Sequence, residues 1–188
     1  MVDEMLLQNS SLGSETHRIN LLPQKLEVFI WRAHRNRLPV RVELDKKGID
    51  LDSVRCPVCD DVLETLDHVL LNCNFAQDVW IRLYRWWGLS FPSGINIQEL
   101  LQGNEPSFSK SSMLRKIWQA VIWVGAYKIW KNRNNKLFKG TNWMASMLFQ
   151  EIQVNSFEWI ANRSKRTSLN WLQRISELGN IQVAVDPG

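Results

Sequence analysis

Cysteine is scarce in this chain of 188 residues, and all three cysteines lie between residues 56 and 73. Residues 1–20 are polar and carry acidic side chains, so they lack the apolar centre of a secretory signal. A disulfide scaffold is therefore not expected, because disulfides belong to exported chains with many paired cysteines. The sequence predicts an intracellular protein in a reducing compartment, with nucleus and cytoplasm left open.

Long hydrophobic runs and strand-like alternation are also lacking. The longest apolar run, residues 117–130, is too short to cross a bilayer and contains Gln119 and Lys128. It predicts a buried helix and no membrane partner. Apolar residues elsewhere recur at steps of three and four, which is typical of helices packed on a core. The predicted fold class is mainly α, and the ten tryptophans are interpreted chiefly as core material.

The residue patterns of common enzymes are missing as well. The chain has no Gly-rich phosphate loop, and its only adjacent aspartates, Asp60 and Asp61, follow directly on a cysteine and suit a solvated turn. A polymerase needs aspartates that hold two divalent ions against the incoming phosphates. His17 lies in the start that is expected to be disordered, and His34 falls on the basic side of the first helix with no cysteine or serine elbow near it. We therefore predict no catalytic residues, no small-molecule substrate and no enzymatic activity.

The organisation predicted from these patterns has five parts. Residues 1–20 form a disordered start, 21–88 a small helical domain, 89–112 a linker, 113–175 a helical region and 176–188 a flexible tail. Within the domain, a helix begins near Pro23 and ends at Leu38-Pro39, because the residue before proline avoids the α region. A short helix over residues 40–47 closes on Gly48, and Asn74 caps a further helix.

The cysteines and one histidine have the spacing C-x2-C-x8-H-x4-C. The two-residue gap lets two thiolates converge around a tight turn, and Thr65 is placed to cap a helical turn that carries the histidine. Three thiolates and one imidazole complete the tetrahedral shell of one structural zinc ion. Inert thiols and a redox pair are the alternatives, and the latter lacks the expected βαβ context. The predicted ligands are Cys56, Cys59, His68 and Cys73.

Basic residues form two clusters in a chain whose formal net charge is +4. Cations interleaved with flat rings suit phosphate contact and base stacking, although a charge run is usually a solvated helix face. The second cluster comprises Lys128, Lys131, Arg133, Lys136 and Lys139. The first cluster, which lies near Trp31 and His34, is the preferred nucleic-acid contact and comprises Arg32, Arg35, Arg37, Arg41, Lys46 and Lys47.

Several short motifs accompany the zinc-type spacing. They are F-x-W-R-A at 29–33, N-R-L-P at 36–39, C-P-x-C at 56–59, E-T-x-x-H at 64–68, Cys73, Trp80, and I-W-K-x-R-N-x-x-x-F at 129–138. Together they resemble the zinc-binding domain that follows the reverse transcriptase in plant LINE-type (non-LTR) retroelements, over about residues 20–140. The resemblance implies a module near a polymerase that holds nucleic acid, with the same four zinc ligands. Val40 departs from the pattern, since a Thr or Ser usually caps the second helix there.

Two functions of different kinds follow from these sequence patterns. The first is a non-catalytic zinc module that binds RNA or DNA. The second is a protein-interaction module that packs the tryptophan-rich helices beyond residue 113 on a partner. A decayed retroelement fragment without a selected role is a third interpretation. RNA or DNA preference, sequence specificity and oligomeric state are not determined by the sequence.

Overall fold

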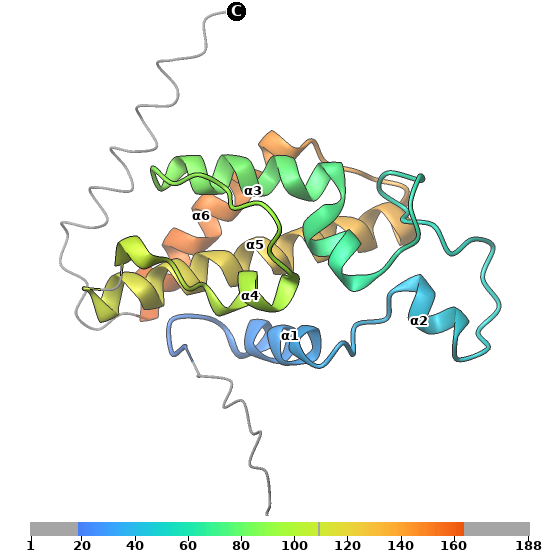
Figure 1. Ribbon diagram of the computed structural model, residues 1–188, viewed down its shortest axis with the longest axis horizontal. Coiled ribbons are helices and arrows are strands. Elements are labelled where there is room, and N and C mark those ends of the chain that lie inside the picture. The colour runs from blue at the N-terminus through green and yellow to red at the C-terminus, as the bar shows by residue number, and fades with distance from the viewer. Residues whose placement is uncertain (1–18, 109, 164–188) are drawn as a thin grey trace, which may run out of the picture.

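The computed structural model describes residues 19–108 and 110–163, and this part of the chain is mainly helical, as predicted (Figure 1). Its only β-type pairing is an isolated bridge between Arg55 and Leu63. None of its helices is both long enough and apolar enough to span a bilayer. In chain order the elements are α1 (Gln24–His34), α2 (Arg41–Asp45), the π-helical turn η1 (His68–Asn72), α3 (Asn74–Trp86), α4 (Ile97–Gln102), the 3-10 turn η2 (Pro106–Phe108), α5 (Ser112–Lys139) and α6 (Ala145–Arg163).

Helix α5 is the centre of the packing. It contacts α1, α3, α4, α6 and η1, and Figure 1 shows it running between α3 and α1. Its middle is buried on nearly every side, because residues 120–126 are all inaccessible to solvent or nearly so. A helix that is apolar all round belongs in the interior of a protein. The prediction of a buried helix over residues 117–130 is confirmed.

Helix α1 buries the predicted stripe of Leu26, Phe29, Ile30 and Ala33. The predicted end of this helix was wrong, because α1 stops at His34 and not at Leu38-Pro39. Asn36 adopts a left-handed conformation with φ 50°, and the N–H groups of residues 36 and 37 donate to the carbonyls of residues 33 and 32. This left-handed closure satisfies the last carbonyls of the helix before the proline is reached.

The expected linker over residues 89–112 is partly packed. It contains α4, which starts with a reciprocal capping box between Asn96 and Glu99 and ends at left-handed Gly103. Ile97, Leu100 and Leu101 of α4 are buried, so one hydrophobic core includes side chains from both sides of this segment. The backbone carbonyl of Leu101 also accepts a hydrogen bond from the indole of a buried tryptophan on α5.

Two further expectations concern chain ends and caps. Cys73, not Asn74, occupies the N-cap of α3, and Asn74 is the first helical residue. Most of the expected disordered start and the whole flexible tail lie outside the described residues. Ile19, at the edge of that start, is buried in the core.

Tryptophan supplies much of the core volume, in agreement with the interpretation from sequence. Trp80 and Trp118 are among the largest fully buried side chains. The Trp118 ring makes edge contacts with Tyr84, Trp87 and Phe108, whose centroids lie 4.9 to 5.9 Å away. Such edge-to-face pairs add stabilisation beyond the area that they bury.

Gly125 generates a prediction, because a Cβ at this position would lie 2.8 Å from the buried ring of Trp80. In an exposed helix interior, Gly→Ala stabilises by about 1 kcal/mol. Here Gly125→Ala should instead lower the free energy of unfolding by about 1–3 kcal/mol, because the core has no room for the methyl group. Urea denaturation measures the change, and a stabilised variant would contradict this account of the packing of α5 on α3.

Candidate metal centre and basic surface

A tight loop carries the first two predicted ligands. The N–H of Cys56 donates to the carbonyl of Val62, and the N–H of Glu64 donates to that of Val54, so the chain folds back on itself. Within the loop the N–H of Asp60 donates to the carbonyl of Cys56, and Asp60 takes a left-handed φ of 56°. Aspartate tolerates this conformation better than most residues do. The turn places the thiols of residues 56 and 59 on the same side.

The other two ligands come from a helical turn that follows. Thr65 caps this turn as predicted, since its Oγ1 accepts a hydrogen bond of 3.1 Å from the N–H of His68. Leu66, Val69 and Leu70 are buried beneath the turn, also as predicted. The turn then widens to a π-helix, in which the N–H of residue 73 donates to the carbonyl of residue 68. This wide turn brings the Cys73 thiol back beside the imidazole, as the spacing predicted, although the π-helical form of the turn was not predicted.

The four predicted ligands meet at one point. Their donor atoms, three sulfurs and one imidazole nitrogen, all lie within 4.8 Å of one another. Cys59 Sγ lies 3.3 Å from His68 Nε2. In a tetrahedral zinc site with Zn–S bonds of about 2.3 Å, the sulfurs are separated by about 3.8 Å. The donor set therefore fits a tetrahedral metal ion with little rearrangement.

The protonation states of these groups favour the same conclusion. The hydrogen bond between the Cys56 and Cys73 thiols raises the pKa of Cys56, with a further contribution from burial, and lowers the pKa of Cys73. Burial lowers the pKa of His68, against the opposing charges of Glu64 and Asp61. A neutral imidazole and a thiolate that is easily formed are the states that bind metal. Binding would displace the shared proton from the Cys56 thiol.

The loop is attached to the rest of the protein by a buried carboxylate, that of Glu64, which is 0% exposed. Its Oε1 accepts a 2.6 Å hydrogen bond from Arg133 Nε, and its Oε2 accepts one from Arg133 Nη2 on α5. The same Oε2 accepts a 2.8 Å hydrogen bond from the backbone N–H of Arg41, the first residue of α2. One side chain thus joins the metal loop, α2 and α5.

This carboxylate also replaces a missing cap. Val40 provides no side-chain acceptor at the start of α2, as the sequence indicated. Glu64 takes over that role from a distant part of the chain. Glu64 was not predicted from the sequence as a functional residue, although its position directly before the capping Thr65 gave a weak signal. Nothing local in the sequence links it to Arg133, 69 positions later.

The members of the first basic cluster have three different surroundings. Arg35 and Arg37 are exposed, and their guanidinium carbons lie 4.9 and 5.6 Å from the ring centroid of Trp31. We call these three residues the Trp31 patch. His34 is not part of it, because its Nδ1 is 2.7 Å from the Gln98 amide oxygen on α4.

The remaining members of the cluster lie elsewhere. Arg32 and Arg41 line a groove between α1 and α5, and Arg41 Nη1 also donates to the backbone carbonyl of Arg55. Lys46 pairs with Glu43 within the α2 segment, and Lys47 is exposed beside it. The side chains of the predicted cluster therefore do not share one set of neighbours.

The second basic cluster is smaller than the sequence suggested. Lys128 is 3% exposed and its Nζ lies 2.7 Å from Glu151 on α6, while Arg133 is buried against Glu64. Both cations are paired with carboxylates of this chain, since a buried cation needs such a partner. They are therefore not available to contact phosphate. Lys131, Lys136 and Lys139 remain at least partly accessible. The sequence pattern of this helix did not indicate which of its cations are buried and which are exposed.

In a comparison with known proteins, one family model matches a segment of the chain. Residues 9–80 match the model of a family described as zinc-binding in reverse transcriptase. The matched segment includes the donor cluster and Glu64 but covers less than half of the chain, and the match is to the zinc-binding domain alone. No curated protein and no solved structure matched the chain. The segment of residues 9–80 is thus similar to the zinc-binding domain described for reverse transcriptase.

The link through Glu64 generates a prediction. Arg133→Met should lower the free energy of unfolding by about 3–5 kcal/mol, because it leaves a buried carboxylate without its cation. The double variant with Glu64→Gln should lose less than the sum of the two single losses, since neither charge remains. Chemical denaturation of metal-loaded protein measures all three variants.

The matched control is Arg82→Met, which breaks an ion pair with Asp78 whose side chains are 43% and 48% exposed. This change should cost less than about 1 kcal/mol. Additive losses for the Glu64 and Arg133 variants, or equal losses for Arg82 and Arg133, would contradict the proposed role of the buried pair.

Proposed function

We propose that this chain is a non-catalytic zinc-binding module, derived from a retrotransposon reverse transcriptase polyprotein, that binds RNA or DNA. The observation that carries the proposal is the convergence of three thiols and one imidazole within 4.8 Å in a segment that matches a reverse-transcriptase zinc-binding family. The ion is zinc, because this donor set is that of structural zinc sites.

The role of the ion is structural. Four protein ligands complete a tetrahedral shell and leave no position for a reactive water. The thiols of Cys56 and Cys73 are buried, which also keeps solvent from the site. When bound, the ion cross-links the loop of residues 54–64 to the turn of residues 65–73. That cross-link fixes the backbone of Glu64, and through its carboxylate the start of α2 and the position of α5.

Nucleic acid contacts the Trp31 patch in this proposal. Two arginines are held over one indole ring, so their guanidinium groups lose little conformational freedom when they bind phosphate. Guanidinium groups bind phosphate through paired hydrogen bonds, and their planes can also stack on unpaired bases. The patch lies at the end of α1, where the chain turns toward α2 and the metal loop.

Metal content is the first test of the proposal. Purified protein should carry about one zinc per chain, and Cys59→Ser or Cys73→Ser should abolish stoichiometric binding. Chelation should expose at least residues 50–80 to hydrogen exchange, because binding energy is folding energy in such domains. Inductively coupled plasma and native mass spectrometry measure the metal, and Asp61→Asn is the control that keeps it. A folded, metal-free protein with full exchange protection would contradict the zinc site.

Binding across a salt series is the second test. Zinc-loaded protein should bind structured RNA or duplex DNA with an affinity that falls steeply with salt. Arg35→Glu with Arg37→Glu should weaken binding and flatten the slope of log K against log salt by about 1.5–2. The matched control reverses two exposed cations on α5, Arg115→Glu with Lys116→Glu. An unchanged slope in the first variant, or an equal change in both, would contradict the Trp31 patch.

A protein-interaction module is the second candidate function. Helix α6 and the turn before it expose Met144, Met147, Val154 and Phe157, with exposed fractions of 65%, 46%, 55% and 40%. An exposed apolar stripe on a helix is typical of a surface that packs on a partner. This function would be favoured by a folded, zinc-loaded protein that binds no nucleic acid at low salt.

A further inference from the structure

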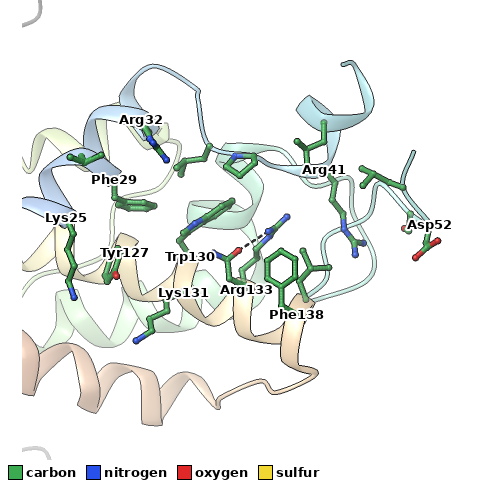
Figure 2. A pocket seen from close by; sticks show the side chains of 18 of the residues that line it. Lys25, Phe29, Arg32, Arg41, Asp52, Tyr127, Trp130, Lys131, Arg133 and Phe138 are labelled. Atoms are coloured by element: carbon green, nitrogen blue, oxygen red, sulfur yellow. Dashed lines mark hydrogen bonds between the residues drawn. The ribbon is translucent and has the colours of Figure 1, made fainter. Parts of the chain in front are cut away.

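A groove of about 770 Å³ lies between α1, the segment of residues 38–53 and the second half of α5. Figure 2 shows its walls: side chains of α1 face those of α5, and Arg41 and Asp52 stand toward one end. We propose that this groove binds single-stranded nucleic acid with unpaired bases. The inference rests on the proposed function. It adds a second binding site, separate from the Trp31 patch, and a requirement that the nucleic acid be single-stranded.

The charges of the groove favour an anionic chain. Lys25 and Arg32 of α1 line one wall, Lys131 of α5 lines the other, and Arg41 lies at the start of α2. Arg133 also lines the groove, but its charge is neutralised by the buried carboxylate of Glu64.

The acidic lining residues are Asp50 and Asp52, both in the connector. Figure 2 places Asp52 at the end of the groove away from Lys25 and Lys131. Cations on opposite walls can therefore contact successive phosphates, and Asp52 marks the end that a phosphate avoids.

The rings of the groove favour unpaired bases. Phe29, Tyr127, Trp130 and Phe138 all line it. Trp130 is 8% exposed and its face is covered by the Arg133 guanidinium, 4.7 Å from the ring centroid. Phe138 is different, because it is 75% exposed at the end of α5. An exposed phenyl ring beside cations is a stacking platform of the kind that single-strand binding proteins use.

A duplex does not fit these features equally well. Its bases are already stacked on each other, so only a terminal pair could cover the Phe138 ring. In a single strand each base offers a free face, and the backbone can bend so that phosphates reach both walls. In the sequence, Arg32 and Arg41 belong to one cluster with Arg35 and Arg37. The fold instead combines the first two with Lys25 and Lys131.

The test uses zinc-loaded full-length protein and a labelled 12-nucleotide single-stranded RNA, with the same sequence as a blunt duplex. Phe138→Ala should weaken single-strand binding about tenfold and leave duplex binding unchanged, because it removes one stacking contact. Phe157→Ala, which removes an exposed ring from α6, is the matched control. Folding of each variant is checked by zinc content and urea denaturation.

A charge variant tests the walls independently of the ring. Lys25→Glu with Lys131→Glu should weaken single-strand binding at least tenfold and lower its salt slope by about 1.4. The control is again Arg115→Glu with Lys116→Glu. Photocrosslinking of a thiouridine-labelled strand should map to the α5 peptide that contains Phe138.

The outcomes separate this inference from the proposed function. If wild-type protein binds the strand and the Trp31 patch variant weakens binding, while the groove variants do not, the groove inference alone is overturned. If folded, zinc-loaded wild-type protein binds neither probe, both are overturned. Equal loss of duplex and single-strand binding in Phe138→Ala would overturn the strand requirement. Tighter binding of an acidic, aromatic peptide that is sensitive to the same variants would overturn nucleic acid as the occupant.

Discussion

The arrangement of the metal loop, α2 and α5 depends on the hydrogen bonds that the Glu64 carboxylate accepts. This carboxylate is fully buried and takes hydrogen bonds from the Arg133 guanidinium and from the first N–H of α2. A buried carboxylate is costly unless such partners satisfy it. Since its partners come from two other elements, the position of each is tied to the others. The backbone of the same residue closes the metal loop, because its N–H donates to Val54.

The metal site and this carboxylate together compensate for a shortage of core. Helix α2 has no buried residue, and the connector that follows it is largely accessible. Apolar burial therefore contributes little to holding this part of the chain. The satisfied ion pair of Glu64 and Arg133 stabilises it instead, and an ion held by the four donors would add a cross-link, which is how small regions commonly offset a small core. The larger helices pack conventionally, through tryptophan and aliphatic side chains around α5.

The distribution of cations follows from this packing. Two cations of α5 form ion pairs with carboxylates of other elements. Lys128 pairs with Glu151, and Arg133 pairs with Glu64. Of the other basic residues, Arg35 and Arg37 belong to the Trp31 patch, and Lys25, Arg32, Arg41 and Lys131 line the groove. In both places the cations stand beside aromatic rings. This combination supports recognition of nucleic acid by phosphate contact together with stacking, more than by charge alone.

Local features of the sequence determined the helical class, the apolar stripe of α1, the burial of the run in α5, the Thr65 cap and the four metal donors. Each of these depends on residues within a few positions of one another or on a spacing that a single turn can close. Tertiary structure decided the rest. The end of α1 is set by left-handed Asn36, and the packing of α4 in the expected linker is set by the core. Glu64 caps α2 and pairs with Arg133 through contacts between segments far apart in the chain. The groove between α1 and α5 also depends on such contacts. No local pattern encodes such contacts. Whether a charged side chain is buried and paired depends on which distant element packs against it in the folded protein.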